Sequence, residues 1–331
     1  MAYKYQTAVV PTLYNSNILT QLVNGSIDTV FKSGIFNNLT DVEMFDLINS
    51  DPSQITNISL DMSDGNTGMI AWRLLPKNVQ NDAEMKKFCG QSPNNYWSIL
   101  GHNLLSAGEQ VNIQPFVAVD NGDTMGTSTD FTISNYINGM TNIEYDGWSM
   151  DTTTDIPNDT AVWIGLEFNA DSWNTNIEIG SIFFGNKYTL PRNCDLSQTT
   201  EFEWKTKQKQ TIKGKTISTL SYDKPNKWVL NDFDLNKNGN PTTSISERSG
   251  VRSYDITFSF LDPKHLIGSN ISGSTDGFDE TNNTDYHADD NAFRTMSKNL
   301  FTEIVSKVKG NHLPLILQLD SNNKNSDNFS M

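Results

Sequence analysis

Short runs of apolar residues separated by turn-rich loops recur through the middle of the chain. Six of these runs lie between residues 56 and 191, at 58–60, 69–75, 96–100, 111–119, 162–168 and 177–184. Several of them alternate apolar and polar positions, and a period of two indicates a β-strand with one buried face. Short strands at this spacing predict one antiparallel β-sandwich domain over 56–191.

The run at 176–191, NIEIGSIFFGNKYTLP, loses its register in the middle. Its apolar positions alternate up to Ile179, slip at Gly180-Ser181 and resume at Ile182. A Gly-Ser slip of this kind predicts a β-bulge that bends an inner strand. Leu190-Pro191 then ends the run, because proline cannot continue the hydrogen-bonded ladder of a central strand.

The pattern changes from residue 198 onward and predicts an α+β module over 198–320. Lys213-Gly214 lies at a hairpin turn, and Tyr254 to Phe260 alternates as a long strand. Apolar residues from Phe293 to Val308 follow helical spacing, and Leu313 to Leu319 has the composition of a buried strand. The module is therefore expected to contain a hairpin, a long strand and a C-terminal helix and strand.

The two ends of the chain are less regular. Residues 1–55 combine short apolar clusters with Asn, Gly and Ser. Within them, Asp41 to Ile48 predicts a short helix capped by Thr40 or Asp41. This segment is either an N-terminal arm that docks on a neighbouring subunit or the leader of the sandwich. Residues 321–331 are expected to form a polar tail.

The net charge and the short apolar runs of the chain argue against two classes of partner. The net charge is −15 and the isoelectric point is near 4.6, so a nucleic acid would be repelled by the overall field. No apolar run approaches the ~20 residues that span a bilayer, and the first residues lack the apolar core of a signal peptide. The sequence predicts a soluble protein made in a cytoplasm, with no nucleic-acid or membrane partner.

One segment is charged against this trend. Residues 201–230 contain seven lysines and three acidic residues, a net charge of +4. Lys205, Lys207 and Lys209 fall two apart, so in a strand they would project from one face as a basic stripe. The stripe either protects an exposed strand edge against aggregation or is an assembly contact for an acidic surface on a neighbouring protein. The sequence leaves both interpretations open.

No arrangement of residues predicts catalysis. His102 follows a strand in the sequence GHNL, where a histidine more often hydrogen-bonds a turn than acts as a base. Neither a Ser/His/Asp spacing nor a nucleophile elbow is present in the sequence. The chain is therefore predicted to have no enzymatic activity, no catalytic residue and no organic cofactor.

A structural calcium ion is the one cofactor for which residues can be named. Asp234, Asn236 and Asn238 precede Gly239, as in the first half of a calcium loop, where glycine permits the sharp turn. The closing glutamate is missing, because Ile245 occupies its position. A plain Asx-Gly turn without metal is the alternative interpretation.

Four stretches, in this order, resemble parts of a known group of proteins. SDGNTGMIAW at 63–72 is similar to a turn of discoidin-like, galactose-binding-type sandwiches, and ILGHNLLSAG at 99–108 resembles a strand and turn of tailed-bacteriophage virion proteins. EIGSIFFGNKYTLP at 178–191 resembles the strand that closes such domains, and GNHLPLILQLD at 310–320 resembles their final helix-strand unit. The resemblance implies a galactose-binding-like or jelly-roll β-sandwich.

The resemblance also implies a function. It indicates a non-enzymatic structural component of a bacteriophage virion, in the tail, the neck or the fibre attachment, synthesised in the host cytoplasm. The implied partners are other copies of the chain, in a homo-oligomer, and other virion proteins. Sandwiches of this type often carry a structural ion beside the first turn, which makes Asp61, Asp64 and Asn66 a second candidate calcium site.

Carbohydrate binding is the alternative function. A discoidin-like sandwich presents loops at one end, where Trp97, Trp148 and Trp173 would stack on the sugars of a host-surface glycan. The competing interpretation places these aromatic side chains in the hydrophobic core. A lectin needs exposed rings, whereas an assembly subunit needs an exposed contact surface.

Overall fold

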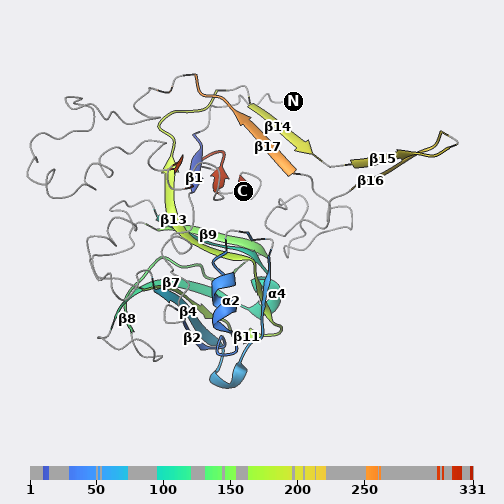
Figure 1. Ribbon diagram of the computed structural model, residues 1–331. Coiled ribbons are helices and arrows are strands. Elements are labelled where there is room, and N and C mark those ends of the chain that lie inside the picture. Colours follow the sequence, from blue (N-terminus) through green and yellow to red (C-terminus); the bar gives the residue numbers. More distant parts are fainter. Residues whose placement is uncertain are drawn as a thin grey trace, which may run out of the picture.

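The computed structural model is mainly β-structure (Figure 1). All strand pairs that it describes are antiparallel, as the alternating sequence pattern predicted. The residues that the structure describes are 10–14, 30–49, 51–73 except 53, 95–120, 131–153 except 144 and 145, 163–203 except 196 and 197, 206–220 except 213, 251–261 except 260, 304–305, 308, 315–322 and 329–330.

Two sheets form a β-sandwich around one core. The order in the five-stranded sheet is β2 (Val30–Gly34), β4 (Thr67–Arg73), β10 (Trp163–Asn169), β7 (Asn112–Asp120) and β8 (Phe131–Tyr136). The order in the six-stranded sheet is β19 (Phe329–Ser330), β18 (Ile316–Gln318), β1 (Thr12–Tyr14), β13 (Ser181–Thr189), β5 (Asn95–His102) and β9 (Gly147–Thr153). The predicted antiparallel β-sandwich is thereby confirmed.

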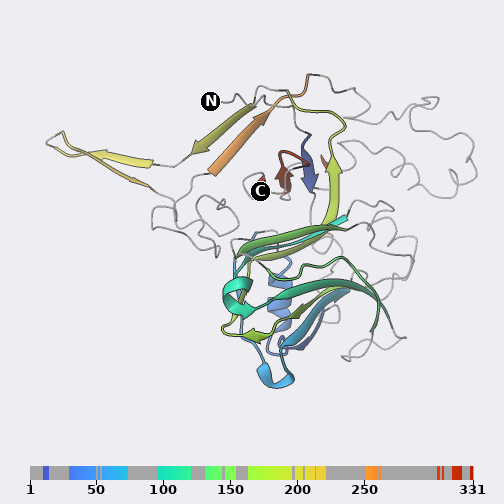
Figure 2. The same ribbon diagram turned by 180° about the vertical axis from the view of Figure 1, so that it is seen from behind.

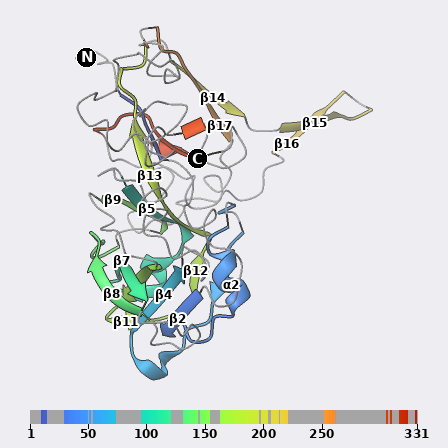
Figure 3. The same ribbon diagram turned by 60° about the vertical axis from the view of Figure 1, so that its left-hand side comes forward.

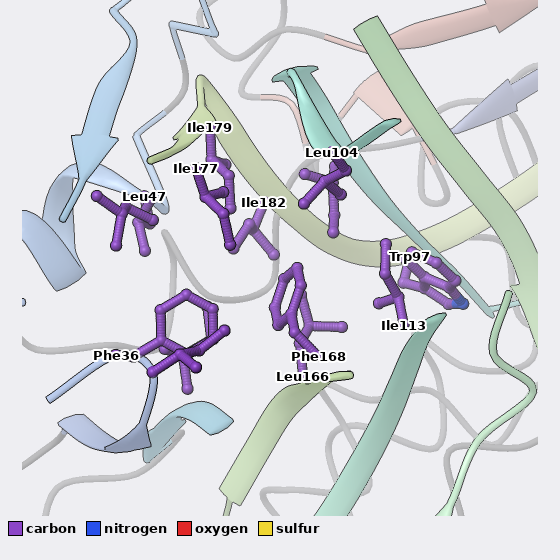
Figure 4. Close-up of a cluster of buried hydrophobic side chains, with 14 of the residues drawn as sticks. Phe36, Leu47, Trp97, Leu104, Ile113, Leu166, Phe168, Ile177, Ile179 and Ile182 are labelled. Atoms are coloured by element: carbon purple, nitrogen blue, oxygen red, sulfur yellow. The ribbon is translucent and has the colours of Figure 1, made fainter. Parts of the chain in front are cut away.

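The core between the sheets is built from side chains at alternate positions of the strands. Leu166 and Phe168 of β10 and Ile113 of β7 point inward from one sheet, and Trp97 of β5 and Ile182 of β13 from the other (Figure 4). None of these five side chains is more than 1% exposed. Burial of one large apolar side chain stabilises by roughly 1.5–3 kcal/mol, so this shared core holds the two sheets together.

The sandwich begins at β2 rather than at the predicted boundary at residue 56. β2 pairs with β4 along its whole length. The helix α2 that follows (Asp41–Asp46) buries Met44 in the same core. Thr40 caps α2 as predicted: its Oγ1 accepts from Glu43 N at 3.2 Å, while Glu43 Oε2 accepts from Thr40 N at 2.7 Å. From Val30 onward the N-terminal segment is therefore part of the sandwich, which is one of the two alternatives considered for it.

The strand with the register slip changes partners instead of bulging. β12 (Ile177–Ile179) pairs with β3 (Thr56–Ile58), and after Gly180 the chain continues as β13, which pairs with β5. The prediction of a bulge at Gly180-Ser181 is therefore corrected, because the phase changes where the strand moves to a second sheet. The register shift lies instead between β5 and β9, at Gly101, whose φ of +70° only glycine adopts without steric cost.

Strand β13 links the sandwich to strands from both ends of the sequence (Figure 3). Its first part, residues 181–186, pairs with β5, and its last part, residues 187–189, pairs with β1. β1 pairs in turn with β18, which lies within the predicted strand at 313–319, and β18 pairs with β19. The C-terminal strand thus belongs to the sandwich sheet and not to a separate module, and the expected polar tail contains a strand.

Short elements complete the ends of the sandwich. They are the 3₁₀-helix η2 (Met62–Asp64), the helix α4 (Leu104–Ala107) and the strands β6 (Gly108–Glu109) and β11 (Ser172–Trp173). β6 pairs with β11. Within the described ranges, no helix has both the length and the apolar character needed to cross a bilayer.

Two antiparallel pairs lie beyond the sandwich. β14 (Gln198–Glu203) pairs with β17 (Val251–Ile256), and β15 (Thr206–Gln210) pairs with β16 (Thr216–Leu220). The strand predicted at Tyr254 to Phe260 is confirmed only in its first part: β17 starts earlier, at Val251, and ends at Ile256. Most of the helix predicted at 293–308 lies outside the described residues. At its end, Val308 N donates to Ile304 O at 2.9 Å, the spacing of an α-helical bond.

Tyr14 fastens β1 to β18 by a buried side-chain contact. Its hydroxyl donates to Gln318 Oε1 at 2.6 Å. Its ring packs edge-on against Tyr96, with the centroids 5.0 Å apart. Burial, together with the nearby Asp151 carboxylate, raises the pKa of Tyr14 to about 12. The neutral phenol is therefore the form that stabilises this junction.

Tyr14 predicts a loss of stability in alkaline solution. Because folding raises its pKa, its contribution is complete below the unfolded-state value of 10 and is lost as the pH rises toward about 12. Tyr14→Phe should lower the unfolding free energy by about 1 kcal/mol at neutral pH and reduce the decline between pH 10 and 12. Denaturant unfolding across that range measures both effects. An equally steep decline in the variant would contradict the assignment.

Candidate functional site

The β15–β16 hairpin is closed by a three-residue turn. Thr211 N donates to Lys215 O and Gly214 N donates to Thr211 O, both at 2.8 Å. Gly214 has a φ of +76°, which is the left-handed position that ends a type I turn in hairpins of this length. The hairpin turn predicted at Lys213-Gly214 is confirmed.

The hairpin projects from the rest of the molecule and has an exposed apolar tip (Figure 2). Every described residue from Gln208 to Ile217 is exposed. Ile212 at the turn is 107% exposed and Ile217 on β16 is 55% exposed. The two strands pair with each other and with no other described strand. Their faces are therefore open to a partner.

Part of the predicted lysine stripe falls on this hairpin. Lys207 and Lys209 are two positions apart in β15, and Lys209 is exposed opposite Ile217 of β16. Lys215, which the stripe did not include, is also exposed and lies two positions before Ile217. Lys205 lies outside the described residues. The segment 206–220 contains four lysines and no acidic residue, so the hairpin is a basic, apolar-tipped arm.

The tryptophans predicted as glycan contacts do not form one exposed surface. Trp97 is fully buried and Trp173 is 9% exposed. The indole N–H of Trp97 donates to Asn138 O at 3.0 Å, and that of Trp173 donates to Asn66 O at 2.8 Å. Rings enclosed in this way cannot stack on a sugar, which corrects the prediction for these two residues. Trp148 is half-buried on β9.

The outer face of the five-stranded sheet carries an aromatic cluster that was not predicted. Phe116 and Trp163 are buried there, and the Phe131 ring lies 5.9 Å from the first and 5.3 Å from the second. Tyr136 is 49% exposed, and its hydroxyl donates to Glu167 Oε2 at 2.8 Å. Burial and the contact with Glu167 raise the pKa of Tyr136. Continuous apolar runs in β7 and β10 were the available signal, since they indicate strands covered on both faces.

Two of the residues at one candidate calcium site hold the local turn. Asp61 Oδ1 accepts from Ser63 N at 3.0 Å and from Ser63 Oγ at 2.6 Å. These hydrogen bonds lower the pKa of Asp61. Asn66 Nδ2 donates to Asp171 O at 2.6 Å. The side chain of Asp64 lies outside the described part of the chain.

Calcium binding stays a prediction at both sites. The other candidate site, formed by Asp234, Asn236 and Asn238, lies outside the described residues. In the part of the chain that is described, no three His, Cys, Asp or Glu side chains gather as metal ligands would. Among the predicted ligands, Asp61 and Asn66 have described side chains, and their oxygen atoms are of the kind that calcium binds.

His102 has the structural role that its sequence context indicated. It is fully buried, its Nδ1 accepts from Leu104 N at 3.3 Å, and its Nε2 lies 2.9 Å from Ser149 Oγ. Because Leu104 N–H can only donate, Nδ1 carries the lone pair and the ring proton sits on Nε2. The imidazole therefore joins the end of β5 to the start of α4 and to β9.

Comparison with known proteins gives a distant likeness of fold. A scan of protein families and a search of curated proteins find no match. Among solved structures, the chain is similar to chitosan-binding module 1 of a chitosanase/glucanase from Paenibacillus sp. IK-5, with 13% identity over 52% of this chain and 98% of the module, and a TM-score of 0.30. It is also similar to CBM32-3 from a family 31 glycoside hydrolase of Clostridium perfringens, with 9% identity, 52% and 99% coverage, and a TM-score of 0.29.

A third structure is the lectin binding domain of lectinolysin complexed with Lewis b, with 8% identity, 53% and 98% coverage, and a TM-score of 0.28. The chain thus has distant structural matches to β-sandwich carbohydrate-binding domains over about half of its length. None of these three structures is described as a virion protein. At such identities and TM-scores the likeness concerns the sandwich and does not extend to function.

Proposed function

We propose that this chain is a non-enzymatic structural subunit that works by protein–protein contacts within a bacteriophage virion. The observation that carries the proposal is the β15–β16 hairpin, which is exposed from Gln208 to Ile217 and pairs with no other described strand. The three stretches at 99–108, 178–191 and 310–320, which resemble tailed-bacteriophage proteins, support the virion as its setting. The hairpin is the surface by which the subunit contacts its neighbour.

The physical argument rests on what an isolated hairpin requires. Two strands without further packing are marginally stable in water, so an ordered arm of this kind gains stability when a partner covers it. Edge protection by lysine would account for Lys207 and Lys209. It does not account for Ile212 at the turn or Ile217 beside the lysines, since exposed isoleucines promote association. A contact surface accounts for both features.

Incorporation into particles tests this proposal. Mass spectrometry of intact virions of a phage that encodes the chain should detect it as a structural component. Reversing Lys207, Lys209 and Lys215 to Glu should reduce its incorporation by about tenfold or more, because each like-charge contact now opposes docking. Circular dichroism of the purified variant serves as the folding control. Particles that lack the chain, or a purified monomer that turns over a polysaccharide, would overturn the proposal.

Carbohydrate binding is the second candidate function, and one observation favours it. Tyr136 presents a half-exposed ring beside the Glu167 carboxylate. An aromatic ring stacks on the apolar face of a sugar, and a carboxylate accepts hydrogen bonds from its hydroxyl groups. Glycan-array binding that is lost in Tyr136→Ala and kept in the hairpin variant would favour this function over assembly.

A further inference from the structure

Exposed large apolar side chains gather at two places in the described chain. Apart from Tyr136, they fall either within residues 41–62 or on the hairpin. The first group consists of Val42 at 71%, Ile55 at 47% and Met62 at 46% exposure, and the second of Ile212 at 107% and Ile217 at 55%. Apolar side chains that gain a covering partner stabilise the contact, so the molecule carries two apolar surfaces that a partner could cover.

The two places have opposite charge. Residues 41–62 contain five acidic residues and no lysine or arginine, whereas residues 206–220 contain four lysines and no acidic residue. Asp41 is already paired with Lys32, at 3.1 Å. Asp46 and Asp51 are exposed. Complementary charge around matching apolar groups sets the register of a contact and speeds association.

Hydrogen bonds tie parts of residues 41–62 to each other and to the turn that precedes α2. Asn49 Nδ2 donates to Gln54 Oε1 at 3.3 Å, which folds the segment after α2 back on itself. Asp61 N donates to Ile35 O at 2.9 Å, which places η2 against the turn that leads into α2. We call the exposed side chains of residues 41–62 the acidic surface. It exposes Val42, Ile55 and Met62 in a segment that contains five acidic residues.

The hairpin lies apart from the acidic surface of its own chain. In all three views it extends away from the sandwich on which α2 lies (Figures 1, 2 and 3). Each copy nevertheless carries both halves of the contact. A hairpin of one copy that meets the acidic surface of the next makes a head-to-tail interface, which generates rings or filaments.

We propose that the hairpin of one copy docks onto the acidic surface of a second copy of this chain. The inference rests on the proposed function, because it names the partner for the same arm. Residues 30–190 as a whole contain six Lys and Arg against twenty Asp and Glu, a net charge of −14. The sandwich of one copy therefore attracts a hairpin and repels another sandwich. Ile212 anchors the contact and the lysines orient it.

A charge-swap experiment on the full chain tests this contact. One variant carries Lys207→Glu, Lys209→Glu and Lys215→Glu, and the other carries Asp46→Lys and Asp51→Lys. Sedimentation velocity at low salt should show association of the wild-type chain. Each variant alone should associate on the order of 10- to 100-fold more weakly, because the first changes the net charge of residues 206–220 from +4 to −2 and the second changes that of residues 41–62 from −5 to −1. An equimolar mixture of the two should recover association, since the unchanged hairpin of the second variant can dock on the unchanged acidic surface of the first.

Two controls separate the parts of the contact. Ile212→Ser changes no charge and should weaken association by about tenfold at every salt concentration, because only apolar burial is lost. Raised salt should weaken the wild-type contact and the mixture alike. A lysine at position 46 lies near the C-terminal end of α2, where the helix dipole favours a cation, so this variant should stay folded by circular dichroism.

The outcomes distinguish this inference from the proposed function. A wild-type chain that stays monomeric at low salt up to about 0.5 mM, or a mixture that fails to associate, overturns the second copy as partner. If virions still contain the chain and exclude the hairpin variant, the proposed function stands and the arm docks on a different virion protein. If the wild-type chain does not associate and virions also lack it, both proposals are overturned.

Discussion

Replacing Trp97 with Ala is expected to lower the unfolding free energy by about 3–5 kcal/mol. The ring is fully buried in the core between the two sheets, where it lies beside Ile113 (Figure 4). Its removal leaves a cavity that the surrounding strands cannot close. It also removes the hydrogen bond to Asn138 O, which adds a smaller cost. The urea midpoint, followed by circular dichroism, measures the loss.

Two matched variants test whether the loss of stability comes from the buried ring of Trp97. Trp97→Phe keeps most of the ring and loses the indole N–H, so it should cost clearly less than Trp97→Ala. Trp148→Ala removes a half-buried ring and should also cost less. A Trp97→Ala chain with an unchanged urea midpoint would refute the core assignment and return Trp97 to the surface, as glycan binding requires.

Gly180→Ala is expected to cost about 1–3 kcal/mol, although a change from glycine to alanine in open space often stabilises through the unfolded chain. A Cβ at this position would overlap the carbonyl oxygen of Pro52 and lie 2.9 Å from that of Leu100. Both are backbone atoms, which cannot move aside as the end of a side chain can. Gly180 N also donates to Leu100 O at 2.9 Å, which holds the residue in place.

A second glycine serves as the control for Gly180. Gly65 has a φ of +98°, and a Cβ added there would have no atom within 4 Å, so its substitution meets backbone strain alone. The cost at Gly180 should therefore rise steeply from Ala to Leu, whereas the cost at Gly65 should change little. Equal costs of Ala and Leu at Gly180 would contradict the close approach. Thermal unfolding of the four variants provides the comparison.

The local pattern of the chain was sufficient to predict individual strands, a cap and a turn. Short apolar runs between turn-rich loops located β4, β5, β7 and β10, because a strand that meets the core carries apolar residues over only a few positions. Thr40 was one of two cap candidates, because a cap side chain satisfies a backbone N–H only three residues away. Gly214 marked the hairpin turn because its left-handed conformation is a local requirement. Each of these signals is complete within a few residues.

The same pattern could not reveal which strand pairs with which. At Gly180 the apolar phase slips, but a bulge and a change of partner produce the same sequence signal. β1 and β18 both pair in one sheet although they come from opposite ends of the sequence. Alternation determines which face of a strand is apolar and carries no information on the neighbour that covers it.

The candidate site also has features that the sequence revealed and features that only the tertiary structure revealed. The excess of lysine in 201–230 was evident from the sequence, because charge is a property of each residue. Composition alone could not show that Ile212 stands at an exposed tip while Trp97 is enclosed, since both are large apolar residues. Their exposure depends on whether strands distant in sequence pack over them, and only the tertiary structure decides that.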